Sequence, residues 1–599
     1  MTRFGSLLAL ACLVAPPVSA QSWGPSTKPV WPDEGPLTWG SRPTSPEISA
    51  NDLRTRLYQF AHDSMQGRRA GEPGNLKGTE YIAAEFQRLG LKQAGDNGTY
   101  FQELPFGPIG FDAAASRLAV GRAALRPRND WIPIIPRNAN GLSGLASLAN
   151  APTVFAGRWG EAAPLDPAVF RGKVAVFVSA PTAPGAFFPA PQPVVSCDAL
   201  PDRFGAAAVT INPRPANLAA PRNLDTRARD AGAAAVLIIG LDEISAANAA
   251  DAFSADASMQ PAPAASKMAG ATISRSAATR IFGKPIEQLT FGQTGSAVSA
   301  TWNYAWRPAA APARNVIAIL PGSDPARAGE YVLVGAHNDH EGVNAVGVDH
   351  DSLRAVNTVT RRQGANDPVC IPTAAQRQRI DSLIARARSI RPARRDSIMN
   401  GADDDGSGTV VMLEIAERFA SERPARSILF ISHQGEEAGL LGSRWFVDHP
   451  TVPLASIVAA HNMDMVGKGR VEQVKFGGPA SVQSLGSRRL SREFGDIIDS
   501  VNAVSAEPMA IDKTWDVTAN PMNRFCRSDQ VNYVRKDVPV TYFSLGYAQD
   551  YHQVTDEAQY IDYEHSASLG RFLHDVMWAI SERTNRPAIA GPDPAYPRC

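Results

Sequence analysis

The sequence predicts an α/β protein that is interrupted by a second, strand-rich domain. Between about residues 315 and 583, apolar strand-like runs alternate with runs whose apolar residues have helical spacing, which is typical of an α/β sheet. Between about residues 112 and 308, Pro, Ala and short β-like runs dominate instead. A chain of 599 residues is also too long for one ordinary domain. We therefore expect one domain to be inserted into the other.

The N-terminal 20 residues have the three parts of a secretory signal peptide. Arg3 supplies a positive charge, residues 7–14 are apolar, and residues 18–20 have the small side chains of a cleavage site. We expect cleavage after Ala20 and a protein that is secreted or periplasmic. A lipoprotein signal at Cys12 is the alternative, although its apolar region would be very short. No other run is long and apolar enough to span a bilayer, so no stable membrane association is expected.

The charge balance and the cysteine content narrow the choice of partner and compartment. Lys and Arg together number 59, as do Asp and Glu, so the formal net charge is zero. A neutral chain argues against nucleic acid as a general partner. Four cysteines follow the predicted signal peptide, and an even number permits disulfides in an exported protein, with three possible pairings. These cysteines, none of which has zinc-ribbon spacing, are Cys197, Cys370, Cys526 and Cys599.

The predicted domain boundaries follow changes in composition along the chain. Residues 21–48 are rich in Pro, Ser and Trp without periodicity and are expected to form a linker or a surface strap. Residues 49–111 are the N-terminal helical part of the main domain, with amphipathic helices predicted after Ser49 and from Thr79 to Leu89. The remaining segments are the inserted domain at 112–308, the main domain at 309–585 and a tail at 586–599.

The inserted domain offers no sign of its own chemistry. Its β-like runs, such as residues 173–178 and 234–239, are not accompanied by a cluster of His and carboxylate side chains. We therefore interpret it as a lid or docking module rather than as a second active site.

The main domain places reactive side chains directly after its predicted strands. Its predicted strands are 331–335, 427–432, 457–463 and 539–545, and its predicted helices are 409–420, 439–448, 485–502 and 565–582. Sites in α/β sheets form at the carboxyl ends of the strands. The residues that follow these strands are therefore the candidates for the site.

Five segments near these strand ends carry His or carboxylate side chains. Three consecutive carboxylates at residues 403–405 repel one another, so a bound cation explains this run best. A neutral imidazole, such as that of His337, is the commonest protein ligand for zinc. Of the adjacent pair Glu436 and Glu437, one can bind metal while the other takes a proton from water. The last two segments contain Asp464 and, beside Tyr551, His552.

Several well-known catalytic motifs are absent from the sequence. There is no His-Glu-x-x-His, because the run from His340 to Asn344 lacks the second His. A Gly-x-Ser-x-Gly motif and a phosphate-binding loop are absent too. These absences argue against a zincin, an α/β-hydrolase and a P-loop enzyme.

The order of these five segments resembles the co-catalytic di-zinc aminopeptidase family, which includes secreted bacterial aminopeptidases and the glutamate carboxypeptidases. The resemblance rests on His337, Asp404, Glu436-Glu437, Asp464 and His552. It covers about residues 315–583 and the helices at 50–90, and it implies the zinc exopeptidase fold, a mixed central sheet flanked by helices. The middle region resembles a protease-associated domain.

The resemblance implies two Zn²⁺ ions per chain and a role for each site residue. Asp404 would bridge both ions and would be followed by a cis peptide bond to Asp405. His337 and Asp464 would complete one metal site, and Glu437 and His552 the other. The remaining roles implied by the resemblance are general base for Glu436, oxyanion stabilisation for Tyr551, and support of the site by Asp529. Independently of the resemblance, the position of Asp339 two residues after His337 predicts that it holds the other ring nitrogen of that histidine or its neighbour. His340 receives no role, Gln530 stands where relatives often have His, and cobalt or manganese would also suit such ligands.

The function expected from this resemblance is hydrolysis of N-terminal residues from peptides. A carboxypeptidase of the glutamate-carboxypeptidase type is an alternative, in which the arginines within residues 386–395 would bind a substrate carboxylate. The favoured interpretation of that arginine run is a solvated helix face. A single-zinc glutaminyl cyclase and a non-catalytic protein of the transferrin-receptor kind are further alternatives, but each lacks the complete ligand set that this sequence has.

A long insertion separates the first two ligand segments. Over sixty residues lie between His337 and Asp404, and residues 373–376 have the pattern of a capping box at the start of a helix. Because the insertion at 341–399 has both ends beside the predicted metals, we expect it to lie over or beside the cleft like a lid and to favour short peptides. Cys370 is expected to tether it, with Cys526 as the suggested partner.

Overall fold

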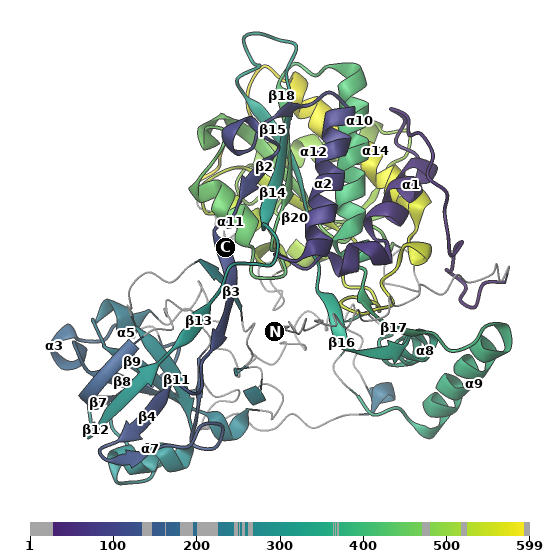
Figure 1. The fold of residues 1–599 in the computed structure, drawn as a ribbon. Helices are drawn as coiled ribbons and strands as arrows, with labels where there is room; N and C mark the ends of the chain where they lie inside the picture. The colour runs from purple at the N-terminus through teal and green to yellow at the C-terminus, as the bar shows by residue number, and fades with distance from the viewer. Residues whose placement is uncertain are drawn as a thin grey trace, which may run out of the picture.

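The chain folds into a large domain built on a mixed sheet, a second domain inserted into it, and a smaller helical insertion (Figure 1). The structure is a computed structural model. It describes residues 28–591 and Cys599, with gaps at 135–145, 162, 180–195, 200–225, 245–248, 251, 254–257, 262–267, 363, 366, 368–369, 470–477, 479 and 517–523. The predicted signal peptide lies outside the described residues. Every helix among the described residues is too short or too polar to cross a membrane.

The main domain is organised around a nine-stranded mixed sheet. In spatial order its strands are β1 (Lys92–Gln93), β14 (Arg314–Leu320), β18 (Ser427–His433), β15 (Tyr331–His337), β19 (Ile457–Met463), β22 (Val540–Ser544), β20 (Ser481–Leu485) and β21 (Ala510–Asp512), and β2 (Phe101–Glu103) also pairs with β14. The four central strands β18, β15, β19 and β22 run parallel. The predicted fold class, an α/β mixed sheet, is confirmed.

Helices cover both faces of this sheet, because successive strand residues point to opposite faces. On β15, Val332 and Val334 pack into the apolar core on one face, whereas Leu333 packs into the core on the other. The first face carries α1 (Ala50–Phe60), α2 (Pro73–Arg88), α10 (Gly408–Glu422), α12 (Arg492–Val504) and α14 (Tyr563–Glu582), and the second carries α11 (Leu441–Asp448) and α13 (Gln530–Val534). Strands buried on both faces explain the continuous apolar runs in the sequence.

Two helix boundaries differ from the prediction. Helix α2 begins at Pro73 rather than Thr79, because proline suits the first turn of a helix. Gly74 permits this start, since a Cβ there would lie 2.1 Å from the Met65 carbonyl oxygen. The helix predicted at 485–502 begins only at Arg492, because the chain first forms β20 and then turns at Gly486, whose φ is +76°.

The inserted domain has its own eight-stranded sheet. In spatial order its strands are β5 (Ala123–Ala124), β4 (Arg117–Val120), β12 (Thr294–Trp302), β7 (Ala146–Arg158), β8 (Val174–Val178), β9 (Ala235–Ile239), β11 (Ala269–Ile273) and β6 (Trp131–Pro133). The run from β7 to β11 is parallel, and short helices accompany it: α3 (Pro167–Phe170), α5 (Arg227–Asp230) and α7 (Arg275–Phe282). The connections to the main domain are β3 (Phe106–Phe111) and β13 (Tyr304–Trp306), which pair with each other, while β10 (Ser258–Pro261) pairs with β3 (Figure 1).

The insertion that follows β15 is a helical pair on a β-hairpin. It lies below the main domain at the right of Figure 1, and the inserted domain lies below the main domain at the left. It consists of β16 (Gly342–Asp349), α8 (His350–Thr360), α9 (Ala374–Ile390) and β17 (Arg395–Met399). The predicted capping box is present at the start of α9, where Thr373 and Gln376 bond each other's backbone amides. The apolar face of α9 packs against α8 and against Val30 and Trp31 of the N-terminal strap.

Two arginines of the run in the insertion do not lie on a solvated helix face. Arg391 pairs with Asp351 at 2.6 Å and also with Glu34, and Arg394 pairs with Glu557 at 2.7 Å. These carboxylates come from other segments of the chain, so the helical pattern alone gave no sign of them. The interpretation of the run as a solvated face is therefore wrong for these arginines.

Two disulfides are formed, and neither is the suggested pair. Cys197 of the inserted domain is bonded to Cys370 of the insertion, and Cys526 is bonded to Cys599. Cys370 does tether the insertion, but to the inserted domain. Their spacing along the chain could not decide among the three pairings, because the partners are 173 and 73 residues apart.

A buried arginine joins three helices of the main domain. Arg56 of α1 is 1% exposed and forms ion pairs with Glu85 of α2 and with Glu414 and Glu417 of α10. Replacing Arg56 by Met should lower the free energy of unfolding by about 3–5 kcal/mol, because buried carboxylates would lose their partner. Denaturant unfolding followed by tryptophan fluorescence measures this.

The matched control for Arg56 is Arg88, which contacts two of the same carboxylates. Its side chain is 42% exposed, so Arg88→Met should lower the free energy of unfolding by less than about 1 kcal/mol. If Arg56→Met and Arg88→Met lower the free energy of unfolding equally, burial is not the reason that the ion pairs of Arg56 stabilise the fold.

Candidate metal centre

Three parallel strands bring the predicted ligands together. β15 ends at His337, and its two neighbours β18 and β19 lead directly to Glu436-Glu437 and to Asp464. His337 is in register with His433 of β18, so these strands end at the same edge of the sheet. The polar residues that follow them are therefore neighbours in space, although up to 127 residues separate them in sequence.

The first ligand group consists of His337, Asp404 and Asp464, all buried. The Nε2 atom of His337 lies 3.2 Å from Oδ1 of Asp404 and 3.7 Å from Oδ1 of Asp464. These are the residues that the resemblance assigns to one zinc site. Their nitrogen and carboxylate donors are of the kinds that zinc binds.

The second ligand group consists of His340, Asp404, Glu437 and His552. Nε2 of His552 lies 3.1 Å from both Oδ2 of Asp404 and Oε2 of Glu437, and Nδ1 of His340 lies 2.9 Å from Oε1 of Glu437. Asp404 thus belongs to both groups and offers one oxygen to each. Glu437 and His552 are the residues that the resemblance assigns to the other zinc site.

His340 is the member of this group that sequence reasoning did not assign. It is 1% exposed, and its ring meets that of His552 edge-on at 5.4 Å between centroids. The sequence did indicate one thing about His340: it stands three residues after His337, at the end of the same strand. Nothing in the local pattern separated a ligand from a packed core histidine.

Unsatisfied polar atoms show that these groups fit a metal. No hydrogen bond from the described residues reaches six buried atoms of the two groups: His337 Nε2, both ring nitrogens of His340, Glu437 Oε1, Asp464 Oδ1 and His552 Nε2. Buried polar atoms without partners are costly. Cations held between them would satisfy these atoms and would offset the repulsion among the carboxylates.

The three consecutive aspartates have different tasks. Asp403 accepts hydrogen bonds from the amide of Gly467 at 2.7 Å, and Asp405 accepts from the amides of His337 at 3.0 Å and Gly408 at 2.9 Å. Only Asp404 belongs to the ligand groups. The peptide bond between Asp404 and Asp405 is cis, as predicted.

The residues expected to support the site lie behind the ligands. Asp339 Oδ1 lies 3.6 Å from Nδ1 of His337 and accepts a hydrogen bond from the amide of Glu436 at 3.1 Å. Asp529 lies 3.6 Å from His433, and burial raises its pKa to about 7. Gln530 accepts from the side chain of Asn462 at 3.0 Å, so it replaces a histidine with a structural hydrogen bond.

The predicted base and the predicted oxyanion donor both lie in the field of the ligand carboxylates. Burial raises the pKa of Glu436 well above its ordinary value, and the carboxylates of Glu437 and Asp464 raise it further, against the lowering effect of His337. Burial likewise raises the pKa of Tyr551, as do the nearby carboxylates of Asp404 and Glu437. The Tyr551 ring stacks on His552, with 3.9 Å between centroids.

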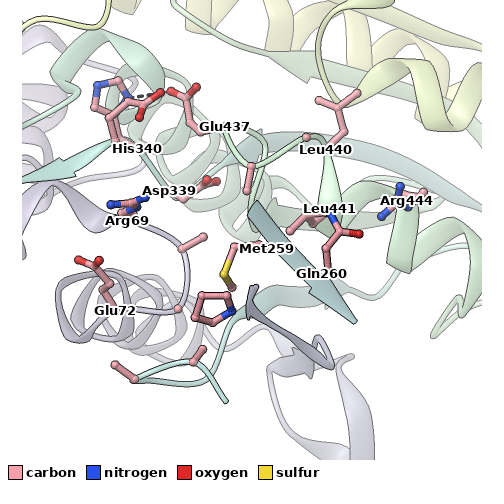
Figure 2. A pocket seen from close by; sticks show the side chains of 18 of the residues that line it. Arg69, Glu72, Met259, Gln260, Asp339, His340, Glu437, Leu440, Leu441 and Arg444 are labelled. Atoms are coloured by element: carbon pink, nitrogen blue, oxygen red, sulfur yellow. Dashed lines mark ion pairs between the residues drawn. The ribbon is translucent and has the colours of Figure 1, made fainter. Parts of the chain in front are cut away.

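A cavity of about 940 Å³ opens between the main and inserted domains beside the second ligand group (Figure 2). Glu437 and His340 line it from the metal side, and Met259 and Gln260 line it from the inserted domain. Glu341 is the one residue of 341–399 among those that line it. The predicted lid role of the insertion remains a prediction, whereas the inserted domain does form a wall of the described cavity.

The chain is similar to known metalloproteases in the part that contains both ligand groups. Residues 315–577 match the family model described as peptidase family M28. A probable zinc metalloprotease of Pyrenophora teres f. teres (strain 0-1) is 25% identical over 206 residues, which cover 32% of this chain and 42% of that protein. Aminopeptidase YwaD of Bacillus subtilis (strain 168) is 47% identical over 68 residues, which cover 11% of this chain and 15% of that protein. This chain thus spans less than half the length of each of these relatives.

Solved structures are similar over nearly the whole chain, at low identity. An aminopeptidase from Aneurinibacillus sp. strain AM-1 superposes with a TM-score of 0.44 and 16% identity, covering 92% of this chain and 98% of that one. A zinc aminopeptidase from Bacillus subtilis superposes with a TM-score of 0.41 and 15% identity, covering 92% and 100%.

Proposed function

We propose that the protein is a di-zinc aminopeptidase, because residues 315–577 match the family model described as peptidase family M28. The observation that carries the proposal is the pair of ligand groups that share Asp404. The second of these groups, through His340 and Glu437, lines a cavity large enough for the end of a peptide. Cleavage of an N-terminal residue is the reaction that this arrangement supports best.

The proposed mechanism assigns one task to each residue at the centre. Two zinc ions would supply Lewis-acid activation of a water molecule and of the substrate carbonyl. Glu436, whose pKa is raised by burial and by the neighbouring carboxylates, would take a proton from the water and pass it to the leaving amine. Tyr551, whose raised pKa keeps its hydroxyl protonated, would donate a hydrogen bond to the developing oxyanion.

Glu341 favours cleavage at the amino end of the substrate. Its carboxylate lines the cavity and lies 3.4 Å from Nδ1 of His552, next to the second ligand group. A carboxylate at that position can pair with the free ammonium group of a peptide. The proposal therefore places the substrate's N-terminus beside Glu341.

A carboxypeptidase is the second candidate, because the same cavity also contains arginines. Arg69, Arg307, Arg444 and Arg535 line it, and a guanidinium binds a carboxylate well. The arginines within residues 386–395, which the carboxypeptidase alternative would use, do not line the described cavity.

A panel of small substrates separates these candidates. We expect aminoacyl p-nitroanilides with a free amine to be hydrolysed, and N-acetylated dipeptides with a free carboxylate to be left intact. Dialysis against a chelator should abolish turnover, and added Zn²⁺, Co²⁺ or Mn²⁺ should restore it. Cleavage of the acetylated dipeptides alone would support the carboxypeptidase, and chelator-resistant hydrolysis would contradict metal catalysis.

We also propose that the protein is exported. The support is the predicted signal peptide at residues 1–20, together with four cysteines that are all paired, as is usual in oxidising compartments.

A further inference from the structure

The loop that carries Tyr551 and His552 has an unusual backbone. His552 has a φ of +54°, which lies in the left-handed region that residues with a side chain seldom adopt. Such a conformation persists only where surrounding contacts enforce it. The contacts at the two ends of this loop, at Asp550 and at Asp556, are therefore of interest for the metal centre.

A single buried ammonium group holds both ends of the loop. Nζ of Lys468 lies 3.2 Å from Oδ2 of Asp550 and 2.8 Å from Oδ1 of Asp556. Lys468 is 1% exposed and stands four residues after the ligand Asp464. Burial by itself would lower the pKa of Lys468, but the carboxylates of Asp550 and Asp556 raise it, so the group stays charged.

Asp556 continues this chain of contacts to the bridging ligand. Its carboxylate accepts hydrogen bonds from the amide of Asp403 at 3.0 Å and from the amide of Asp404 at 3.1 Å. The backbone of Asp404, which belongs to both ligand groups, is thus held by the same ion-pair cluster that holds the His552 loop.

The insertion supplies the second cation of this cluster. Nη1 of Arg354, on α8, donates to Oδ2 of Asp550 at 2.8 Å, and its Nη2 pairs with Asp33 of the N-terminal strap. Arg354 is 7% exposed. One arginine therefore connects the strap and the insertion to the residue that precedes Tyr551.

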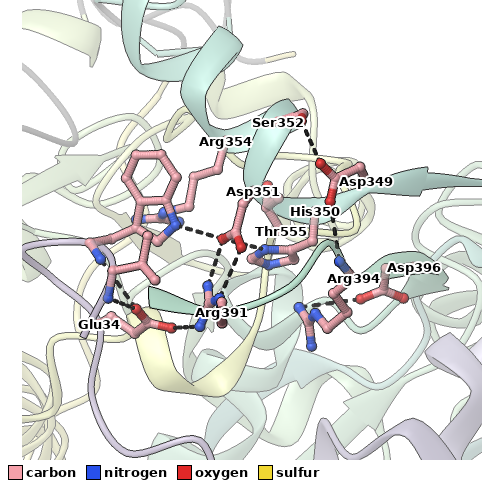
Figure 3. A network of polar contacts seen from close by, with 12 residues as sticks. Glu34, Asp349, His350, Asp351, Ser352, Arg354, Arg391, Arg394, Asp396 and Thr555 are labelled. Atoms are coloured by element: carbon pink, nitrogen blue, oxygen red, sulfur yellow. Dashed lines mark hydrogen bonds and ion pairs between the residues drawn. The ribbon is translucent and has the colours of Figure 1, made fainter. Parts of the chain in front are cut away.

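Further buried pairs hold the insertion in place around Arg354 (Figure 3). Arg391 joins Asp351 to Glu34 of the strap, while Arg394 and His350 pair with Glu557, at 2.7 and 2.9 Å. Figure 3 shows Arg391 between Asp351 and Glu34, with His350 and Arg394 nearby. The insertion is thus fastened to the far end of the same loop.

We propose that the 341–399 insertion braces the metal-binding loop, and that Arg354 is a positioning residue that acts on His552 through Asp550. The proposal rests on the proposed metal centre. It goes beyond the expected lid role, because the brace would act on the ligands themselves rather than on access to them. Without Arg354, Asp550 would keep the hydrogen bonds from Lys468 and Thr555. It would lose its ion pair with α8 and, through Arg354, its connection to Asp33 of the strap.

The test compares Arg354→Gln with Arg391→Gln in the full-length protein. Arg391 is a matched control. Its side chain is also mostly buried, and its two carboxylate partners, Glu34 and Asp351, join the strap to the insertion. Neither of these two ion pairs involves the loop that carries His552. Zinc affinity would be measured by competition with a chromophoric chelator, the Co²⁺-substituted protein would be examined by visible absorption, and Tm would be recorded for both variants.

We expect Arg354→Gln to weaken one of the two zinc sites by about tenfold, as the loss of a residue that orients a ligand does. Its Co²⁺ absorption spectrum should change, because the His552 ligand would be less well oriented. Arg391→Gln should lower Tm to a similar extent while keeping the zinc affinity and the Co²⁺ spectrum of the wild type. Arg354→Lys, which keeps a charge near Asp550, should restore part of the zinc affinity.

Equal zinc affinity in Arg354→Gln, Arg391→Gln and the wild type would overturn the proposal. If Arg354→Gln does not fold, Asp550→Asn provides the same test, since it removes the ion pair from the other side and keeps the size of the side chain. Normal zinc affinity in Asp550→Asn would overturn the proposal equally. Because zinc binding is measured without peptide cleavage, a protein that binds two zinc ions but hydrolyses no peptide would refute the proposed function and not the brace.

Discussion

Replacing Glu436 by Gln is expected to lower kcat by roughly 10²–10⁴, the usual contribution of a positioned general base. The substitution keeps the size of the side chain and removes the group that would accept the proton. Glu436 belongs to neither ligand group, so the variant should retain two zinc ions per chain. Turnover of an aminoacyl p-nitroanilide and zinc content by elemental analysis, measured on the same sample, check this expectation.

The matched control is the neighbouring residue Glu437. Its two carboxylate oxygens lie 2.9 Å from His340 and 3.1 Å from His552, so Glu437→Gln replaces an anionic member of the second group with a neutral one. This variant should lose one zinc ion first, and added zinc should restore part of its activity. Loss of zinc in Glu436→Gln with full retention in Glu437→Gln would show that the two roles are reversed. Near-normal turnover in both would refute the hydrolase proposal.

Replacing Asp404 by Asn is expected to weaken both metal sites together and to abolish turnover. Asp404 offers Oδ1 to His337 and Oδ2 to His552, so it is the one side chain common to the two groups among the described residues. A neutral amide cannot balance two cations. The loss of zinc affinity should therefore exceed the roughly 10–100-fold that the loss of a supporting residue causes. Isothermal titration of the metal-free protein with zinc measures both sites.

Asp403 provides a control of the same residue type, one position away. Burial is the main cause that raises its pKa, to about 8, and its carboxyl group accepts from the Gly467 amide and the Ser407 hydroxyl. An asparagine oxygen can accept the same bonds, so Asp403→Asn should bind zinc nearly as the wild type does. If the two variants lose zinc equally, the carboxylate run acts as a whole and Asp404 has no special role.

Sequence reasoning succeeded where the pattern is local. The strands predicted at 331–335 and 427–432 are present at Tyr331–His337 and Ser427–His433, because unbroken apolar runs between polar ends are typical of strands buried on both faces. The capping box before α9 was also visible, since all of its atoms lie within four residues. The helix predicted at 485–502 began too early, because its apolar spacing continues into β20. The pairing of β20 with β22 and β21 separates the two elements.

The sequence by itself determined the α/β architecture and the order of the ligand-bearing strand ends, because apolar periodicity and the residues that follow each strand are local properties. Only the tertiary structure decided that His340 joins one of the two ligand groups. It also decided that the arginines of the insertion face buried carboxylates, and that Cys197 bonds Cys370. The physical reason is the same in each case: the partner lies tens to hundreds of residues away, so the interaction leaves no periodic trace in the chain around either residue.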